Sequence, residues 1–124
     1  MTGRTDWFDL PVKDMADAMS FYEGLFGWSY CQMDDSPLAD YVMIDAGGHL
    51  IGGLRKVKSS SPAPLGSAPI IYFTVERLQA AVQRARDLGA EIIGTPVDLG
   101  KGRGQYQWLR DRGGHLIGIW ANQS

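Results

Sequence analysis

The chain carries one eight-residue motif twice. Residues 45–52 read DAGGHLIG and residues 111–118 read DRGGHLIG, so the two copies differ only at their second position. Self-similarity of this kind indicates that one supersecondary unit occurs twice in the fold. We therefore interpret the 124 residues as two copies of one module, which restricts the architectures that the chain can adopt.

Each half also contains one amphipathic segment. Apolar side chains recur at helical spacing over residues 12–22 and again over residues 75–85. That spacing places them on a single face of a helix. Asp14 is suited to cap the first helix, and Gly27 and Gly89 are suited to end the first and the second helix.

A short strand precedes each helix, and three strands follow it. The glycine pair in each repeated motif permits positive φ and therefore favours a tight turn before the last strand of its module. The chain is thus predicted to be an α+β protein with two tandem βαβββ modules. We expect strands at residues 6–12, 28–33, 41–46 and 50–55, and at 70–75, 91–94, 106–110 and 116–121.

The two modules are expected to form a single domain that spans residues 1–124. Hydrophobic residues make up 44% and charged residues 21% of the chain, which is typical of a globular protein. Residues 59–69 are rich in Ser, Pro and Ala, which indicates a linker. Module 1 is therefore placed at about residues 1–58 and module 2 at about residues 70–124.

The first strand of each module is expected to direct alternate side chains to the core and to the functional site. Alternate side chains of a strand point to opposite faces. Phe8 continues the apolar stripe of the following helix, so Trp7 and Asp9 must point to the other face. The same parity sends Ile70 and Tyr72 to that face in the second module. We expect the functional site there.

Charge and cysteine content exclude several classes of function. Lys and Arg total 12 against 14 Asp and Glu, with no run of either sign, so neither nucleic acid nor an anionic membrane is expected as a partner. The absence of a signal-like or membrane-spanning apolar segment predicts a cytoplasmic protein. The single cysteine, Cys31, is expected to be a small packed residue.

These segments resemble the vicinal oxygen chelate superfamily, which includes glyoxalases, bleomycin resistance proteins and extradiol dioxygenases. The similarity rests on WFDLPVKD at residues 7–14, FYEGLFGW at residues 21–28 and the closing segment 111–120. It extends over essentially the whole chain and is nearest to small proteins related to lactoylglutathione lyase. The resemblance implies that the two modules form a curved, cup-like mixed sheet with the helices on the outside.

In that superfamily, the first and last strands of each module each supply one ligand to a divalent metal. Hard cations require oxygen or imidazole donors, and no side chain at the four matching positions offers one. The two histidines, His49 and His115, fall in the hairpin turns instead. We therefore predict no cofactor. The four positions are Trp7, Gly52, Ile70 and Gly118.

Aromatic side chains and one acid are expected to line the cup. The predicted ligand-binding residues are Trp7, Asp9, Tyr72, Trp108 and Trp120. Burial among aromatic rings would raise the pKa of Asp9 and suit it to act as a general base. The alternative is that Asp9 pairs with an arginine or is solvated at the mouth of the cup. The glycines at 52 and 118 would leave the cup free volume for an organic ligand.

Three hypotheses follow. The favoured one is metal-independent binding of a small apolar or aromatic molecule, in resistance or sequestration, by a homodimer. The second is a glyoxalase-like lyase, isomerase or dioxygenase that uses a divalent metal with non-standard ligands, or Asp9 as a base. The third is a cup filled by its own side chains that acts only through association. Whether the protein catalyses any reaction is left open at this point.

Overall fold

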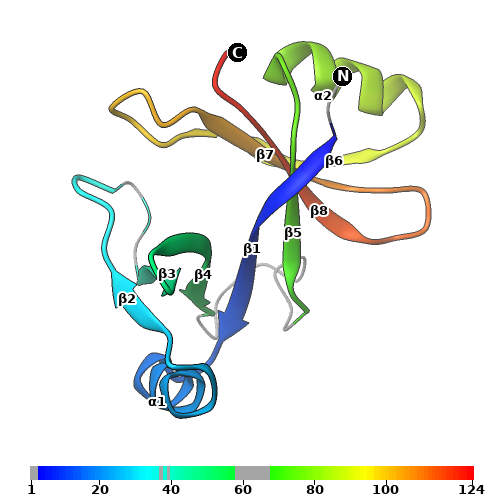
Figure 1. The fold of residues 1–124 in the computed structure, drawn as a ribbon. Coiled ribbons are helices and arrows are strands. Elements are labelled where there is room, and N and C mark those ends of the chain that lie inside the picture. The colour runs from blue at the N-terminus through cyan, green and yellow to red at the C-terminus, as the bar shows by residue number, and fades with distance from the viewer. Residues whose placement is uncertain (1–2, 37, 39, 58–67) are drawn as a thin grey trace. The chain divides into compact units, whose positions relative to one another are not determined.

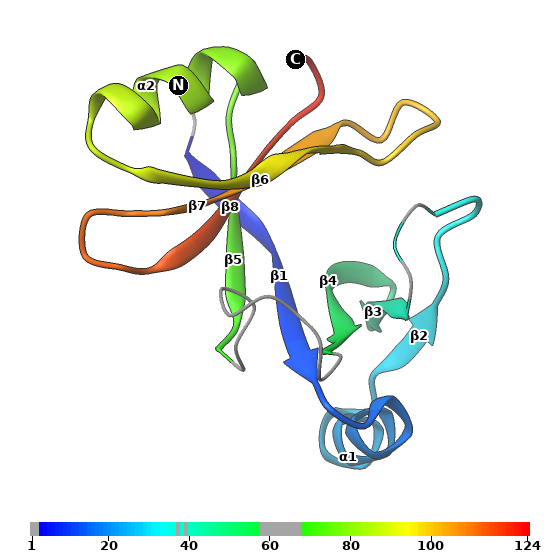
Figure 2. The ribbon, with the colours of Figure 1, turned by 180° about the vertical axis from the view of Figure 1, so that it is seen from behind.

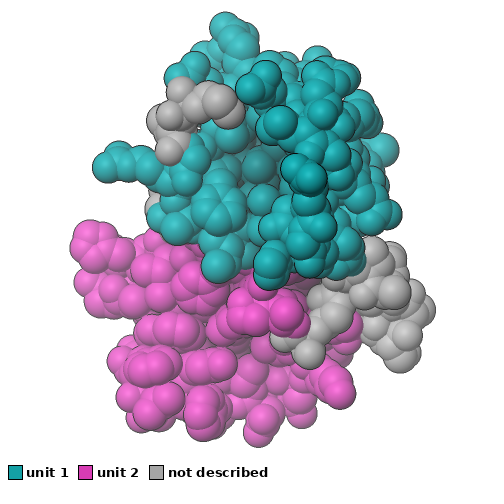
Figure 3. Space-filling model, turned by 90° about the vertical axis from the view of Figure 1, so that its right-hand side faces the viewer, with its two compact units in different colours: residues 1–6, 71–124 teal, residues 7–70 magenta. Residues whose placement is uncertain are grey.

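The computed structural model describes residues 3–36, 38, 40–57 and 68–124 (Figure 1). The chain divides into two compact units, coloured in Figure 3. Unit 2 comprises Trp7–Ile70, and unit 1 comprises the residues up to Asp6 together with Ile71–Ser124. Most of the predicted linker at 59–69 lies outside the described residues.

The first module occupies unit 2. It consists of β1 (Arg4–Val12), α1 (Met15–Phe26), β2 (Ser29–Cys31), β3 (Tyr41–Ala46) and β4 (His49–Lys56). The strand order is β2-β3-β4-β1, in which β1 runs parallel to β4 and the other pairs are antiparallel. The first residues of β1 belong to unit 1.

The second module occupies unit 1, except that its first residue, Ile70, belongs to unit 2. It consists of β5 (Ile70–Thr74), α2 (Leu78–Asp87), β6 (Glu91–Asp98), β7 (Gln105–Arg110) and β8 (Leu116–Ala121). The strand order is β5-β8-β7-β6, with β5 parallel to β8. The predicted α+β class and the duplicated βαβββ order are therefore confirmed.

Local side-chain chemistry sets the ends of α1. The Oδ1 atom of Asp14 accepts a hydrogen bond from the backbone N–H of Asp17 at 3.0 Å. Gly27 adopts a left-handed conformation with φ of 74° and donates its N–H to the carbonyl of Glu23. Both the predicted cap and the predicted end of this helix are confirmed.

The two helices differ in how completely they are packed. Helix α2 buries Leu78 and Val82 against Leu109, Ile119 and Ala121, and it lies over one face of unit 1 (Figures 1 and 2). Helix α1 has no fully buried residue. Its aromatic side chains instead form a cluster in which Tyr22 stacks on Trp28 at 5.0 Å, and Phe8 lies 6.5 Å from Trp28. Phe8 therefore faces α1, as the strand parity predicts.

The prediction of a packed Cys31 is wrong, because this side chain is exposed. Strand β2 has only three residues and lies at the edge of its sheet. Tyr30 points inward and donates its hydroxyl to the carbonyl of Met19 at 3.1 Å. Alternation along the strand then sends Cys31 outward.

The two copies of the repeated motif form different turns. In the first copy, Ala46 pairs with His49 across a two-residue turn in which Gly47 and Gly48 have φ of 65° and 94°. The register then shifts between the pairs formed by Asp45 and Ile44, because Ile51 of β4 has no partner on β3. The predicted tight turn is confirmed here, and it is accompanied by a β-bulge.

The second copy forms a longer loop without that register shift. The Oδ1 atom of Asp111 accepts hydrogen bonds from the backbone N–H groups of Gly113 at 3.0 Å and His115 at 2.8 Å. Strand β7 ends at Arg110, and pairing with β8 begins at Leu116 and continues in regular register. The side chain of Asp111 thus holds a wider loop between the strands.

Candidate functional site

Asp9 is a buried carboxylate at the centre of unit 2. Its side chain is 1% exposed. Its Oδ1 atom accepts a hydrogen bond of 2.6 Å from the hydroxyl of Tyr41, and its Oδ2 atom accepts bonds of 3.2 and 3.0 Å from Nε and Nη2 of Arg55. An ion pair with two guanidinium hydrogen bonds compensates the cost of burying the carboxylate.

Tyr41 links this ion pair to a tryptophan. The indole Nε1 of Trp7 donates to the Tyr41 hydroxyl at 2.9 Å, and the Arg55 guanidinium carbon lies 5.1 Å from the centre of the Tyr41 ring. Burial, and next the negative charge of Asp9, raise the pKa of the Tyr41 hydroxyl far above its usual value. Tyr41 therefore stays protonated and acts as a donor to Asp9. We call Trp7, Asp9, Tyr41 and Arg55 the Asp9 network.

The Asp9 network bears on the two interpretations of this carboxylate. Both of its oxygens accept hydrogen bonds from side chains held on β3 and β4. This geometry supports the interpretation in which Asp9 pairs with an arginine. The role of Asp9 as a general base stays a prediction, because a base would have to release one of these donors to accept a proton from a substrate.

Gly53 is the residue that makes room for the Asp9 network. It pairs with Asp9 on β1 and with Met43 on β3. A Cβ atom at this position would overlap the phenol group of Tyr41. Only glycine lets the Tyr41 ring lie across β4 and reach the carboxylate.

Neither Tyr41 nor Arg55 was predicted as a site residue. The two residues are directly opposite each other on β3 and β4. On β4, Arg55 is two residues beyond Gly53 and therefore points to the same face. This signal depends on the strand register, which sequence spacing alone does not provide.

Unit 1 carries an aromatic cluster at the corresponding place. The indole Nε1 of Trp108 donates to the Tyr72 hydroxyl at 2.9 Å. The ring of Tyr106 meets Tyr72 edge-on at 5.5 Å and lies 5.8 Å from Trp108. Tyr72 and Tyr106 are each 6% exposed, whereas Trp108 is only half-buried. We call Tyr72, Tyr106 and Trp108 the aromatic cluster.

The aromatic cluster lies on the face of its sheet that points away from α2. Leu109 and Ile119 pack against α2, so alternation sends Trp108 and Gly118 to the opposite face. Trp120 shares that face by the same parity, and its indole donates to the carbonyl of Arg103 at 3.0 Å. Tyr106 was not predicted, although its position two residues before Trp108 places it on the same face.

The five predicted site residues therefore fall into two groups. Trp7 and Asp9 are joined through Tyr41 in unit 2. Tyr72 and Trp108 are bonded directly in unit 1, and Trp120 lies on the same face of that unit. Each group holds polar atoms among aromatic rings, as expected of a binding surface.

The expectation that Gly52 and Gly118 occupy equivalent places is wrong. Gly52 pairs with Phe8 and Ile44, whose side chains face α1, whereas Gly118 pairs with Tyr72 and Trp108 on the face away from α2. The cause is the register shift after the first turn, because a slip of one residue reverses the face of a strand. A Cβ atom at Gly52 would overlap the carbonyl oxygen of Phe8, and one at Gly118 would overlap the Tyr72 ring. Neither glycine leaves open volume.

The residues at the four metal positions do not fit a resident divalent cation. The indole N–H of Trp7 is a donor that is already bound to Tyr41, and Ile70 is a buried apolar side chain. Gly52 and Gly118 have no side-chain donor atom. Within the described residues, no group of three or more His, Cys, Asp and Glu side chains is arranged to hold a metal ion. No chemical step is therefore derived through a metal.

Comparison with known proteins gives consistent matches. The family model described as "Glyoxalase/Bleomycin resistance protein/Dioxygenase superfamily" matches residues 4–119. The anthracycline biosynthesis protein DnrV of Streptomyces peucetius is 28% identical over 129 residues, which cover 95% of this chain and 46% of DnrV. The chain thus spans about half the length of the curated relatives it matches.

Solved structures show the same fold. Methylmalonyl-CoA epimerase from Mycobacterium tuberculosis is similar with a TM-score of 0.64 at 18% identity, covering 97% of this chain and 88% of the epimerase. The Mn(II)-bound glyoxalase from Novosphingobium aromaticivorans is similar with a TM-score of 0.67 at 16% identity, covering 99% and 40% of the two chains. In the described part of this chain, neither helix has the length and apolar character needed to cross a membrane.

Proposed function

The chain belongs to the glyoxalase/bleomycin resistance protein/dioxygenase superfamily, and from this premise we propose that it binds a small, largely apolar or aromatic molecule without a metal. Resistance or sequestration is the role we assign to such binding. The aromatic cluster of unit 1 is the observation that carries the proposal.

The geometry of the aromatic cluster supports the binding of a ring. The hydrogen bond from Trp108 to Tyr72 and the edge-on contact of Tyr106 hold three rings in place on one face. Rings that are already ordered lose little conformational entropy when a ligand binds. Aromatic pairs add geometric preference to apolar burial, so a flat ligand is favoured.

The donor set supports the metal-independent part of the proposal. The four positions that hold the cation elsewhere in the superfamily carry an indole, an aliphatic side chain and two glycines. A ligand must then be held by stacking and hydrogen bonding rather than by chelation.

The relatives suggest a first probe. DnrV is named for anthracycline biosynthesis. Anthracyclines are flat, fused-ring aromatic molecules, which is the shape that the aromatic cluster favours. We propose this class as the starting ligand set, with doxorubicin as a practical example.

Isothermal titration calorimetry with chelator-treated protein tests the proposal. Doxorubicin is expected to bind, and Trp108→Ala is expected to weaken binding about tenfold, because it removes one stacking ring and the donor to Tyr72. Trp28→Phe is the matched control, since Trp28 packs on Tyr22 beside α1 in the other unit. Unchanged affinity in Trp108→Ala would argue against the aromatic cluster as the site.

Elemental analysis of the purified protein tests metal independence. Stoichiometric divalent metal, together with binding that chelator abolishes, would favour the enzymatic alternative. In that case Asp9→Asn should remove any lyase, isomerase or dioxygenase activity if Asp9 acts as the base.

We also propose that the protein works as a homodimer. Phe21, Leu25 and Phe26 of α1 are each more than half exposed. A patch of large apolar side chains on one helix is typical of an interaction surface. Light scattering after size exclusion should give the mass of two chains, and Phe21→Ser with Leu25→Ser should give the mass of one.

A further inference from the structure

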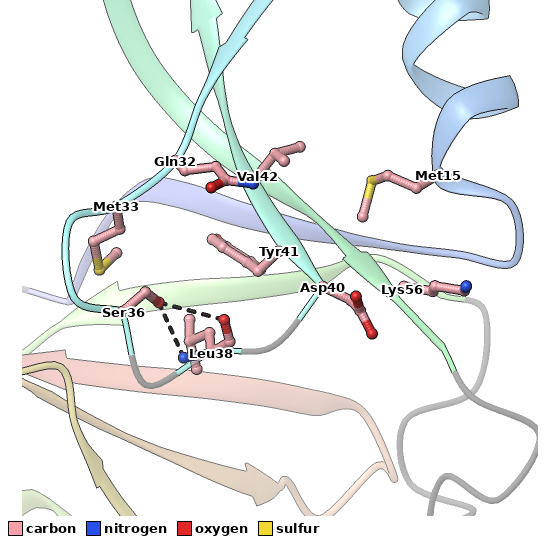
Figure 4. Close-up of a pocket in the computed structure, with 9 residues that line it drawn as sticks. All are labelled: Met15, Gln32, Met33, Ser36, Leu38, Asp40, Tyr41, Val42 and Lys56. Carbon is pink, nitrogen blue, oxygen red and sulfur yellow. Dashed lines mark hydrogen bonds between the residues drawn. The ribbon is translucent and has the colours of Figure 1, made fainter.

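A cavity of about 470 Å³ lies within unit 2, beside Tyr41 (Figure 4). Its walls come from the start of α1, the segment after β2, the start of β3 and the end of β4. Tyr41 is the one residue that it shares with the Asp9 network. The aromatic cluster contributes no residue to it.

Part of the cavity wall is apolar. In Figure 4, Met33 lies to the left of the Tyr41 ring and Leu38 lies below it. The ring itself is fixed, because its hydroxyl is bonded to Asp9 and Trp7. Methionine side chains are flexible and polarisable, and they make favourable contacts with aromatic rings. A flat hydrocarbon ring of a ligand therefore suits this part of the wall.

One end of the cavity is charged. Lys56 and Asp40 lie on the far side of Tyr41 from Met33 (Figure 4). Asp40 makes a further interaction within the chain. Among the described residues, the Lys56 ammonium has no hydrogen bond or ion pair. Lys56 is therefore the cationic group that a ligand can meet at this end.

A hydrogen-bonding group completes the lining. The amide of Gln32 borders the cavity and, within the described part of the chain, has no hydrogen-bond partner. The hydroxyl of Ser36, in contrast, already accepts from the backbone N–H of Leu38 at 3.0 Å. Gln32 can thus donate to a ligand oxygen, whereas Ser36 is occupied by the loop.

We propose that this cavity binds a small aromatic carboxylate. The ring of the ligand lies between Met33 and Tyr41, and its carboxylate points toward Lys56, with Gln32 as an additional donor. This site lies in a different unit from the aromatic cluster and selects an anion. It goes beyond the proposed function and does not depend on it.

Three naphthalene probes of one shape test the charge selectivity. Calorimetry should show that 2-naphthoate binds about fivefold more tightly than 2-naphthamide, because the Lys56 ammonium is solvent-exposed and screened. A preference for 2-naphthylmethylammonium would mean that Asp40 dominates, and it would overturn the proposal. Equal affinity for the acid and the amide would do the same.

Variants of Lys56 test whether its charge causes the preference for the acid over the amide. Lys56→Met should remove the preference for the acid, and Lys56→Arg should keep it. Lys13→Met is the control, since Lys13 is an exposed lysine of the same unit that does not line the cavity. A preference that survives in Lys56→Met contradicts the proposal.

NMR signals of the methionine methyl groups give an independent measure of where 2-naphthoate binds. With ¹³C-methyl methionine, 2-naphthoate should shift the signals of Met15 and Met33, which line the cavity, more than that of Met19. Trp108→Ala removes a ring of the aromatic cluster and should leave the naphthoate-induced shifts of Met15 and Met33 unchanged, so this site can fail or succeed separately from that cluster. Methionine shifts that are lost in Trp108→Ala would contradict a separate site.

Discussion

In unit 2 the repeated motif closes with a two-residue turn and a β-bulge, whereas in unit 1 it closes with a loop held by Asp111. The only residue that differs between the copies is Ala46 against Arg112. Because the first turn is followed by a register shift and the second is not, Gly52 and Gly118 lie at positions that face opposite sides of their sheets. Sequence identity within a repeat therefore does not establish structural equivalence.

The strand pairing identifies the true counterparts. Asp9 pairs with Gly53 as Tyr72 pairs with Gly118. Tyr41 faces Arg55 across β3 and β4, and the equivalent pair across β7 and β8 is Tyr106 and Trp120. The Asp9 network and the aromatic side chains thus occupy the same place in the two modules, one with an ion pair and one with rings.

The largest expected difference between the modules concerns their central contacts. Asp9→Ala would leave the Arg55 guanidinium without its counter-charge and should lower the free energy of unfolding by about 3 kcal/mol. In unit 1, Tyr72→Phe removes the hydroxyl that accepts the hydrogen bond from Trp108 and should cost about 1 kcal/mol. Urea unfolding measures both values.

A double variant separates lost charge from lost packing in unit 2. Asp9→Leu with Arg55→Met removes the whole ion pair and should be less destabilising than Asp9→Ala alone. If Asp9→Ala costs no more than Tyr72→Phe, the ion pair is not the main stabilising contact of the Asp9 network.

Alanine at the two glycines of the motif should show that they face different surroundings. A Cβ atom at Gly52 would overlap a backbone oxygen that cannot rotate away, whereas one at Gly118 would overlap the Tyr72 side chain. Both variants should lose about 1–3 kcal/mol, with Gly52→Ala at the upper end of that range. Only Gly118→Ala should also weaken binding at the aromatic cluster. Equal losses in stability and in binding would argue against the register difference.

The turns themselves allow a smaller test. Gly47 has φ of 65°, so Gly47→Ala should cost about 1 kcal/mol. Gly113, at the same position in the second copy, does not have positive φ, and the nearest atoms to an added Cβ lie 3.4 Å away in the His115 ring. Gly113→Ala should therefore be close to neutral. Thermal unfolding of the two variants provides the comparison, and equal losses would contradict it.

The smallest expected effect is the pH response of the loop in unit 1. The backbone N–H of His115, followed by its side chain, lowers the pKa of Asp111 below 3.8. Its contribution to loop order is present above that value and is lost as the pH falls through the lower folded-state pKa. The amide signals of Gly113 and His115 should shift with a midpoint below 3.8. Asp111→Asn should abolish this transition, and a midpoint above 3.8 would exclude the hydrogen bonds to Asp111.

Hydrophobic periodicity and turn residues were sufficient to predict the elements of both modules, because these signals are local. The parity of Phe8, Asp9 and Tyr72 was predicted for the same reason. The bulge at Ile51 of β4 was not predicted, since it depends on how the turn closes and not on composition. The contacts of Tyr41 and Arg55 with Asp9 depend on the register between β1, β3 and β4. The Asp9 network could therefore be predicted only in part.

The distribution of the four indoles has a practical consequence for folding studies. Trp7 and Trp28 belong to unit 2, and Trp108 and Trp120 belong to unit 1. Two single-tryptophan variants, one with its indole in unit 1 and one with its indole in unit 2, would report separately on the unfolding of each unit. Coincident transitions at the two reporters would establish the duplicated chain as one cooperative folding unit.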